Sequence, residues 1–340
     1  MYDTFVPGAM ILPSWIIHPQ VGSLSFMIER VRVAVVGVGN NTSALVQGIA
    51  LHRETGSLVG IRRPVIDGLA VDDIDFVAAF ARSDEKIGRD LTEAIFMAPN
   101  NFPKLNCELP EAGVPVIKGL VDATEIDRVA AALAGAEVLL YSAPSGRPET
   151  AKAYAVAAHR AGIAFINTTS DPVARDPELM ANFEAAGLPL LGDDLASQFG
   201  TSVLHDALLR LLADRGLTLV SSYQVNLGGT EDFRNLVENP NSKHQSKLNA
   251  LSAADKVQVA PLGYLSQLKS QKVAHLNLEA QGWGETAVSL DVKLKVHDPS
   301  GAAGVNIDLI RMAASALRKG QGGSLAEATP MLKSPPGTAI

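Results

Sequence analysis

The chain has 340 residues, of which 47% are hydrophobic and 19% charged, and its formal net charge is −7 at pH 7. These values predict a globular protein with one large or two medium domains and enough apolar material for a core. The acidic balance, without any basic run, excludes an electrostatic nucleic-acid binder. The single cysteine, Cys107, excludes an intrachain disulfide and a thiolate metal cluster within one chain.

Residues 1–29 are apolar in patches, but Pro7, Pro13 and Pro19 interrupt them and no basic segment precedes them. We therefore predict neither a signal peptide nor a membrane-spanning helix, and no membrane partner. The cysteine content suits the reducing cytoplasm. We treat residues 1–29 as an N-terminal arm, because the first clear strand begins just after them.

From residue 30 onward, strands and helices alternate. Predicted strands cover residues 31–39, 74–80, 136–145, 163–169 and 188–195, and predicted helices cover residues 43–50 and 148–162. This alternation predicts an α/β domain with a Rossmann-type doubly wound parallel sheet. We assign residues 30–200 to this dinucleotide-binding domain.

The pattern changes after residue 200. A helix is predicted at 201–216 and a strand at 217–227, and the alternating runs 275–281 and 287–298 are typical of antiparallel strands with one wet face. Residues 201–298 therefore form a second, α+β domain with an open, mostly antiparallel sheet, and we assign catalysis and oligomerisation to it. A final helix, 304–320, returns to the first domain, which residues 299–340 complete. The apolar face expected on helix 201–216 comprises Val203, Leu204, Ala207, Leu208, Leu211 and Leu212.

A glycine-rich turn follows the first predicted strand. Gly37 and Gly39 allow the backbone to turn tightly and to approach a pyrophosphate at a helix N-terminus. The side-chain amides of Asn40 and Asn41 add donors for the phosphate oxygens. The third glycine of the dinucleotide fingerprint is absent, so an ordinary tight turn is the alternative interpretation.

The second predicted strand ends in Ala81, Arg82 and Ser83, where a dinucleotide-binding fold usually carries an acid for the adenine ribose. An arginine with a serine and without an acid suits a 2′-phosphate, so the pattern is compatible with NADP as well as NAD. Alternatively, Arg82 stacks on the adenine or faces solvent. Ser142, near the end of the third predicted strand, is a further candidate for cofactor binding.

Asp193 and Asp194 end the last predicted strand of the first domain, where open α/β sheets bind ligands. We predict that both acids, and Ser197 shortly after them, contact the cofactor. The alternative interpretation is that the acids cap a helix starting near Ser197.

Lys243 and Lys247 lie four residues apart and share one face if their segment is helical. Like charges at this spacing cost about 0.2–0.5 kcal/mol, so the pair is compatible with a bound phosphate or a developing oxyanion. Taken alone, the pattern also fits a solvated helix face. Four further charges look like surface residues in isolation: Lys272, Lys333, Asp232 and Asp298.

Eight segments form an ordered set along the chain: GVGNN (37–41), GDDLASQ (192–198), NLGGTEDFRNL (226–236), SKHQSK (242–247), QKVAHL (271–276), LKVHDP (294–299), GVNIDLIR (304–311) and LKSPP (332–336). Taken together, these segments resemble the inositol-3-phosphate synthase (myo-inositol-1-phosphate synthase) family, closest to its short bacterial type, over residues 30–337. The order and spacing agree throughout, which is more specific than the glycine turn alone. The resemblance implies a Rossmann domain, a catalytic domain with an open sheet, a homotetramer and tightly held NAD.

The resemblance also implies a reaction. Family members oxidise glucose 6-phosphate at C5, form an enolate toward C6, close C6 onto C1 and reduce the product with the same cofactor, which gives 1D-myo-inositol 3-phosphate. The implied lysines surround the phosphate and the developing oxyanions, one aspartate lies near the nicotinamide, and two orient lysines and hydroxyls. Transferred motif by motif, this catalytic set is Lys243, Lys247, Lys272, Lys333, Asp194, Asp232 and Asp298.

The sequence departs from the family pattern at several positions. Ala81 replaces the ribose acid, Ala196 a lysine, Thr230 an asparagine and Ser270 an acid. These losses leave open a paralogue that cyclises another sugar phosphate, such as fructose 6-phosphate to a five-membered carbocycle. A sugar-phosphate dehydrogenase and a non-catalytic dinucleotide sensor are further alternatives, although a sensor has no oxyanion for the lysines to stabilise. Family members often use a cation near the cofactor phosphates, but the seven histidines show no metal-binding spacing and we assign no ligands.

Overall fold

The structure is a computed structural model that describes residues 30–238 and 241–339, so the predicted N-terminal arm lies outside the described residues. Its larger unit is built on a parallel sheet with the order β5-β4-β1-β6-β7-β8. This is the strand order of a doubly wound dinucleotide-binding fold, and it confirms the predicted fold class. The strands are β1 (Val31–Val36), β4 (Ile74–Ala81), β5 (Val116–Lys118), β6 (Val138–Tyr141), β7 (Ala164–Asn167) and β8 (Leu190–Leu191).

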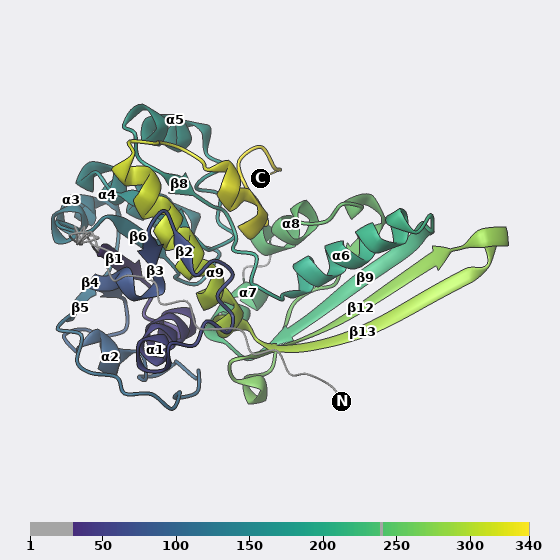
Figure 1. The fold of residues 1–340 in the computed structure, drawn as a ribbon, viewed down its shortest axis with the longest axis horizontal. Helices are drawn as coiled ribbons and strands as arrows, with labels where there is room; N and C mark the ends of the chain where they lie inside the picture. Colours follow the sequence, from purple (N-terminus) through teal and green to yellow (C-terminus); the bar gives the residue numbers. More distant parts are fainter. Residues whose placement is uncertain (1–29, 239–240, 340) are drawn as a thin grey trace, which may run out of the picture.

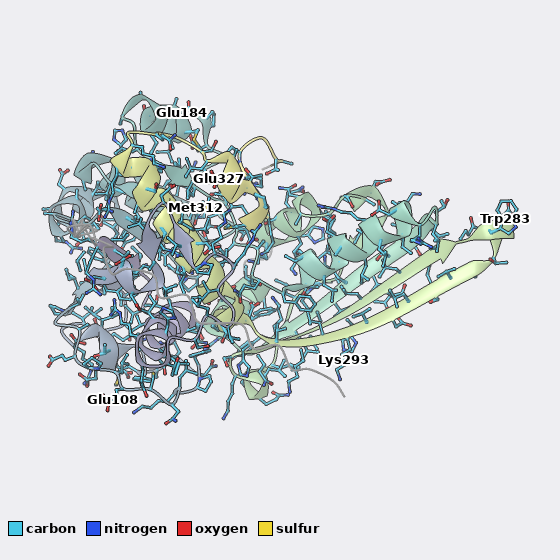
Figure 2. All side chains as sticks on the ribbon, viewed as in Figure 1. Glu108, Glu184, Trp283, Lys293, Met312 and Glu327 are labelled. Carbon is cyan, nitrogen blue, oxygen red and sulfur yellow. The ribbon has the colours of Figure 1, made fainter. Side chains whose placement is uncertain are left out.

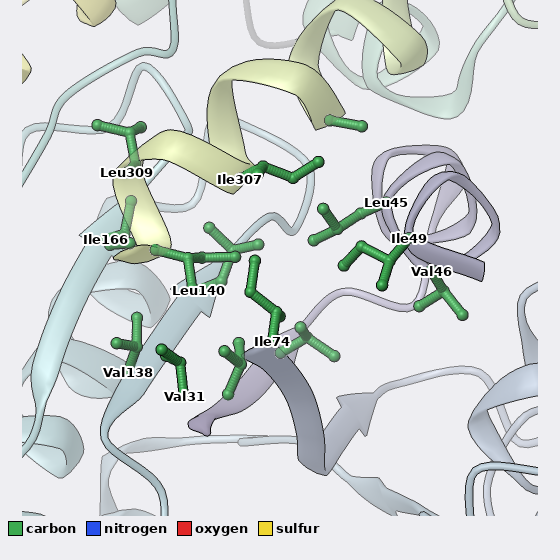
Figure 3. Packing of buried hydrophobic residues seen from close by; sticks show 14 of the residues in the cluster. Val31, Leu45, Val46, Ile49, Ile74, Val138, Leu140, Ile166, Ile307 and Leu309 are labelled. Carbon is green, nitrogen blue, oxygen red and sulfur yellow. The ribbon is translucent and has the colours of Figure 1, made fainter. Parts of the chain in front are cut away.

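Helices cover both faces of this sheet (Figure 1). The alternation along β1 explains why, because Val33 and Val35 point into one apolar layer and Ala34 and Val36 into the other. Helices α1 and α9 fill the first layer, part of which Figure 3 shows, and α3 and α4 fill the second. The helices of this unit are α1 (Asn40–Thr55), α2 (Leu91–Ala94), α3 (Ile126–Ala132), α4 (Pro148–Ala161), α5 (Pro177–Ala185) and α9 (Asp298–Arg318).

Helix α9 brings the end of the chain back against the parallel sheet and α1. It begins at Asp298, earlier than the predicted start at residue 304. Its fully buried Arg311 pairs with Asp308 at 2.8 Å and donates to backbone carbonyls within residues 63–69. The buried guanidinium is thereby neutralised and hydrogen-bonded, which is what makes its burial tolerable.

A second sheet extends away from the parallel one (Figure 1). Its three long strands are antiparallel neighbours, whereas two short strands run parallel to β9, so the open and mostly antiparallel sheet is confirmed. The exposed Trp283 lies at the tip of the β12–β13 hairpin (Figure 2). The elements are β9 (Thr218–Gly228), β10 (Val257–Val259), β11 (Gly263–Tyr264), β12 (Gln271–Gln281), β13 (Ala287–His297), α6 (Thr201–Asp214), α7 (Glu231–Glu238) and α8 (Asn241–Asn249).

Helix α6 packs against this second sheet, but not with the face that its apolar periodicity predicts. Its buried side carries His205 and Asp206, whereas Val203 is 38% and Leu211 54% exposed. The prediction was wrong for these two and for Ala207, which is also exposed, because polar contacts orient the helix: His205 Nε2 lies 2.7 Å from Ser222 Oγ on β9. Three other predicted residues pack at the edge of the cluster: Leu204, Leu208 and Leu212.

The remaining elements are small. A two-stranded hairpin and several 3₁₀ turns connect the larger elements. In the part of the chain that the structure describes, no helix has both the length and the apolarity to cross a bilayer. These small elements are β2 (Val65–Ile66), β3 (Leu69–Ala70), η1 (Val71–Asp73), η2 (Ala123–Glu125), η3 (Ala254–Lys256), η4 (Ser266–Leu268), η5 (Trp283–Glu285) and η6 (Ala326–Met331).

Candidate active site

A cavity of about 510 Å³ opens at the carboxyl ends of β1, β4 and β6. Sheets of this topology bind ligands at that edge, next to the point where the strand order reverses. Residues of α8 and β12 complete the lining, so the cavity spans both units of the molecule. The arrangement places a dinucleotide-type edge directly beside the second sheet.

The turn after β1 fits a dinucleotide phosphate. Gly37 has φ +92°, and a Cβ there would lie 2.6 Å from the carbonyl oxygen of Ser142, so a side chain is excluded. A Cβ on Gly39 would meet nothing within 4 Å, which leaves open space above the turn. Helix α1 starts here with neither a side-chain cap nor an acid in its first turn, so its N-terminal N–H groups suit an anion.

Side chains around this turn are held by one another. Asn40 Nδ2 donates to Asn101 Oδ1 at 2.7 Å, and Asn41 Nδ2 donates to Ser142 Oγ at 3.3 Å. The buried Lys86 donates to the Val38 carbonyl at 2.7 Å, and burial lowers its pKa to about 8. The two asparagine amides therefore already have protein partners, and Lys86 adds a cation under the turn.

The strand end that usually binds the adenine ribose is basic. Arg82 and Ser83 follow β4 and line the cavity, as does Arg147 just before α4. The acidic residues that line the cavity come from other segments: Asp194, Glu231, Asp232 and Asp298. Among the described lining residues, the strand end after β4 thus offers guanidinium and hydroxyl groups but no carboxylate.

Asp194 is the centre of the lysine cluster. Its Oδ1 accepts hydrogen bonds from Lys243 Nζ at 2.9 Å and Lys333 Nζ at 2.6 Å, and its Oδ2 accepts one from Ser246 Oγ at 2.6 Å. Burial alone would raise the pKa of Asp194, but the two ammonium groups outweigh it and hold that pKa well below its ordinary value. Conversely, the carboxylate raises the pKa of Lys243 in spite of its burial.

The four lysines of the predicted catalytic set differ in their partners. Lys272 pairs with Asp298, but no described carboxylate accepts a hydrogen bond from Lys247. Burial, followed by repulsion from three neighbouring lysines, lowers the pKa of Lys247 well below its ordinary value. Burial also lowers the pKa of Lys333 to about 8. One cavity thus combines amines that are paired with a carboxylate and an amine whose pKa is lowered, which is a combination suited to binding an anion and to moving a proton.

Sequence comparisons agree with this geometry. A family model described as Myo-inositol-1-phosphate synthase matches residues 200–299. An inositol-3-phosphate synthase of Mycolicibacterium smegmatis is 37% identical, and the match covers 90% of this chain and 93% of that protein. The chain belongs to the inositol-3-phosphate synthase family.

Comparison with solved structures gives the same result for this inositol-3-phosphate synthase family member. The crystal structure of Ari2 matches with a TM-score of 0.82 and 51% identity, over 91% of this chain and 94% of that one. A myo-inositol-1-phosphate synthase-related protein from Thermotoga maritima matches with a TM-score of 0.74 over 90% and 93% of the two chains. At 22% identity this second match concerns the fold alone. The family indicated by the sequence segments is therefore confirmed.

The structure brings every predicted catalytic residue of the family motifs to the cavity. These are Lys243, Lys247, Lys272, Lys333, Asp194, Asp232 and Asp298. Asp232 also accepts a hydrogen bond from the Ser145 backbone N–H at 3.2 Å, which ties α7 to the loop after β6. The predicted cofactor residues that line the cavity are Gly37, Gly39, Asn40, Asn41, Arg82, Ser142, Asp194 and Ser197.

Asp193 is the exception among the predicted cofactor residues, because it does not line the cavity. It is fully buried, and its carboxylate accepts hydrogen bonds from Asn167 Nδ2 at 2.8 Å and Arg175 Nε at 3.1 Å. Backbone N–H groups of residues 173–175 donate hydrogen bonds to the same carboxylate. Its lone pairs are thus used to fix the loop after β7 rather than to contact a cofactor in the cavity.

The positions at which this family member departs from the pattern lie in or near the site. Ala196 and Thr230 line the cavity. Because alanine is shorter than the lysine expected at position 196, it leaves additional space in the cavity. Ser270 Oγ lies 3.0 Å from His297 Nδ1, next to the Lys272–Asp298 pair. Among the described residues, no group of three or more His, Cys, Asp or Glu side chains could hold a metal ion.

Three site residues escaped the sequence reasoning: Ser246, Lys86 and Gln224. Ser246 lies three residues after Lys243, so helical spacing places it on the same face, a signal that was available. Lys86 and Gln224 carry no local signal. They acquire their roles because the fold buries them next to the glycine turn and Lys247, respectively.

Proposed function

We propose that this protein converts glucose 6-phosphate to 1D-myo-inositol 3-phosphate with NAD as a catalytic cofactor. The observation that carries the proposal is the convergence of four lysines on one cavity that begins at a dinucleotide-type glycine turn. Gly37, Gly39 and the N-terminus of α1 would hold the pyrophosphate. The Mycolicibacterium smegmatis relative is named an inositol-3-phosphate synthase, which supports the same product.

The chemistry that a bound nicotinamide supplies is reversible oxidation of the C5 hydroxyl. Loss of a proton from C6 of the resulting ketone gives an enolate, and C6 then attacks the C1 carbonyl to close the ring. Negative charge moves from the enolate oxygen to the C1 oxygen during these steps. The ammonium groups of Lys243 and Lys272, fixed by Asp194 and Asp298, would stabilise both oxyanions in a buried site.

The substrate phosphate needs positive charge that the protein does not already neutralise. Lys243 and Lys333 share one carboxylate, so the pair carries excess positive charge toward the cavity. A phosphate dianion next to them would be bound by charge-assisted hydrogen bonds. A phosphate anchored in this way would hold C1 and C6 in position for ring closure. Positioning of this kind removes part of the entropic cost from the reaction barrier.

A product assay tests the proposal. Purified protein with NAD is given glucose 6-phosphate and, separately, fructose 6-phosphate, and the products are identified by phosphorus and carbon NMR. We expect an inositol phosphate from glucose 6-phosphate without net reduced cofactor. A carbocycle from fructose 6-phosphate alone would overturn the substrate but keep the cyclase chemistry. An open-chain ketone with accumulating reduced cofactor would identify a dehydrogenase.

The cofactor proposal extends to NADP. Many dinucleotide-binding folds carry a ribose-binding acid at this strand end, and such an acid would repel a 2′-phosphate. Here Arg82 and Ser83 occupy the strand end instead, and Arg147 lines the same cavity. Guanidinium and hydroxyl groups at this strand end suit the 2′-phosphate. We therefore propose that the site binds NADP as well as NAD.

We also propose a homotetramer in which the second sheet contacts another copy. Val288 and Leu290 of β13 pair in register with Ala280 and Leu278 of β12, which are buried. The two β13 residues nevertheless remain 37% and 38% exposed. An apolar strip that continues a buried layer into solvent is the kind of surface that a second copy covers.

A further inference from the structure

Among the four lysines of the predicted catalytic set, Lys243, Lys247, Lys272 and Lys333, Lys247 is the one whose described hydrogen-bond partner is an amide rather than a carboxylate. Its Nζ lies 3.5 Å from Oε1 of Gln224 on β9. The other three lysines each have a carboxylate partner, either Asp194 or Asp298. A neutral amide oxygen stabilises an ammonium group much less than a carboxylate does.

Gln224 is built into the wall behind Lys247. Its side chain is fully buried and does not line the cavity, whereas Lys247 does. Its Oε1 also accepts a hydrogen bond from Asn226 Nδ2 at 3.2 Å, which orients the amide oxygen. Its Nε2 has no partner among the described residues. A buried donor left without a partner is destabilising, and local destabilisation of this kind is typical of functional sites.

The charges around Lys247 favour the uncharged amine. Lys243 on α8, Lys272 on β12 and Lys333 in the C-terminal segment all lower the pKa of Lys247. Asp194 acts in the opposite direction, but it already holds two of these ammonium groups, and the other nearby acid that pairs with a lysine, Asp298, is bound to Lys272. His205, on α6, is also buried, and burial together with Lys247 lowers its pKa to about 4, so it is uncharged near neutral pH.

We propose that Gln224 is a positioning residue that holds the Lys247 amine with its lone pair toward the cavity, where this amine is the base that removes the C6 proton. This inference rests on the proposed function. In the step, the C6–H bond breaks, its electron pair forms the C5–C6 double bond and the carbonyl pair moves to the C5 oxygen. The proton goes to Nζ of Lys247, and the ammonium formed returns it to the C1 oxygen after ring closure. Each proton removed is thus given back, and no external reactant is consumed.

The test introduces a carboxylate at the position of the amide. In Gln224→Glu, the new carboxylate should raise the pH at which Lys247 loses its proton by about one to three units. The Nζ signal of Lys247 is followed in protein labelled with ¹⁵N-lysine and is assigned by its loss in Lys247→Met. We expect the acid limb of the kcat/KM profile to move to higher pH by the same amount, with activity recovered at high pH. Gln258→Glu, on the exposed side of β10, is the matched control and should shift neither profile.

Two results overturn the inference: a wild-type Lys247 signal that titrates with ordinary lysines, or a Gln224→Glu titration identical to wild type. If Gln224→Glu does not fold, Gln224→Met replaces it. That variant lacks the acceptor, so kcat should fall by about tenfold or more while KM changes little, since positioning losses act on the chemical step. An unchanged kcat contradicts the positioning role. The NMR titration does not require turnover, so it separates this inference from the proposed reaction.

Discussion

Lys333 Nζ lies 2.6 Å from Asp194 Oδ1, although 139 residues separate the two in the chain. The backbone joins them as well, because the Lys333 N–H donates to the Asp194 carbonyl at 2.7 Å. The C-terminal segment therefore forms part of the site. The lysine cluster consequently depends on the correct docking of both segments.

Replacing Lys333 by methionine should lower kcat/KM by about a hundredfold or more, because it removes one charged donor from the site of developing negative charge. Dinucleotide affinity, measured by calorimetry, should stay near wild type. Lys319→Met is the matched control, since Lys319 is a half-exposed lysine paired with Asp67 on the outer side of the molecule. Equal losses in both variants would mean that the effect is not specific to the site.

Asp194→Asn should lower the free energy of unfolding by about 3–5 kcal/mol near neutral pH, as expected when a buried ion pair loses one member. Asparagine tolerates the backbone φ of +56° at this position, so the change isolates the charge. Urea unfolding measures the difference. Asp67→Asn, at φ +48° in an exposed pair, is the control and should cost less than about 1 kcal/mol.

The same Asp194 contribution has a defined pH dependence. The pKa of Asp194 in the folded protein lies below its ordinary value of 3.8, so the carboxylate is favoured by folding. Its stabilisation is fully present above that ordinary value and is lost as the pH falls toward the folded-state value. The gap in unfolding free energy between wild type and Asp194→Asn should therefore shrink in acid. A gap that widens in acid would contradict the assigned charge state.

The pKa of Lys333, about 8, predicts an alkaline limit to activity. As the pH rises through that value, Lys333 loses its proton and with it the charge that faces the substrate, so kcat/KM should fall. Lys333→Arg keeps its charge at all accessible pH values and should lose this limb while remaining active. An identical alkaline limb in the variant would assign the limit to another group.

Cofactor choice tests the basic strand end after β4. Arg82→Ala should weaken NADP binding by about tenfold or more, because a charged hydrogen bond is lost, and should change NAD binding by less than about twofold. Isothermal titration calorimetry with both dinucleotides measures the ratio. Arg89→Ala, an exposed arginine paired with Glu93 away from the cavity, should leave both affinities unchanged. Equal weakening of NAD and NADP by Arg82→Ala would place Arg82 against the adenine instead.

Oligomerisation through the second sheet is tested by Leu290→Asp. A charge in the exposed apolar strip of β13 should dissociate the assembly, because burying it unpaired is costly. Light scattering after gel filtration gives the mass. Lys293→Asp, on the other face of the same strand, is the control. A tetramer that survives Leu290→Asp would move the contact elsewhere.

The sequence allowed much of the parallel sheet to be predicted, because β1, β4, β6 and β7 are long enough to show apolar runs next to periodic helices. The strands that escaped prediction have two or three residues and show no period; they are β2, β3, β5, β10 and β11. The buried face of α6 was mispredicted because His205 is buried through a hydrogen bond, which hydrophobicity does not reveal.

The candidate site likewise has a part that the sequence predicts and a part that it does not. The family segments located the four lysines, but their partners are tertiary: Asp194 meets Lys333 from the far end of the chain, and Gln224 reaches Lys247 across a strand and a helix. Asp193 shows the converse, since its neighbour Asp194 faces the cavity while it turns into the loop after β7. Adjacent acids at a strand end thus have separate tasks that only the fold distinguishes.

The most direct test of the central claim follows one hydrogen atom. Glucose 6-phosphate deuterated at C5 is incubated with the protein and NAD, and the phosphorylated product and the cofactor are analysed by mass spectrometry and NMR. Ring closure between an internal oxidation and an internal reduction predicts an inositol phosphate that retains the deuterium, with no net deuterated cofactor. Deuterium that accumulates in the reduced cofactor beside an open-chain product would contradict the account.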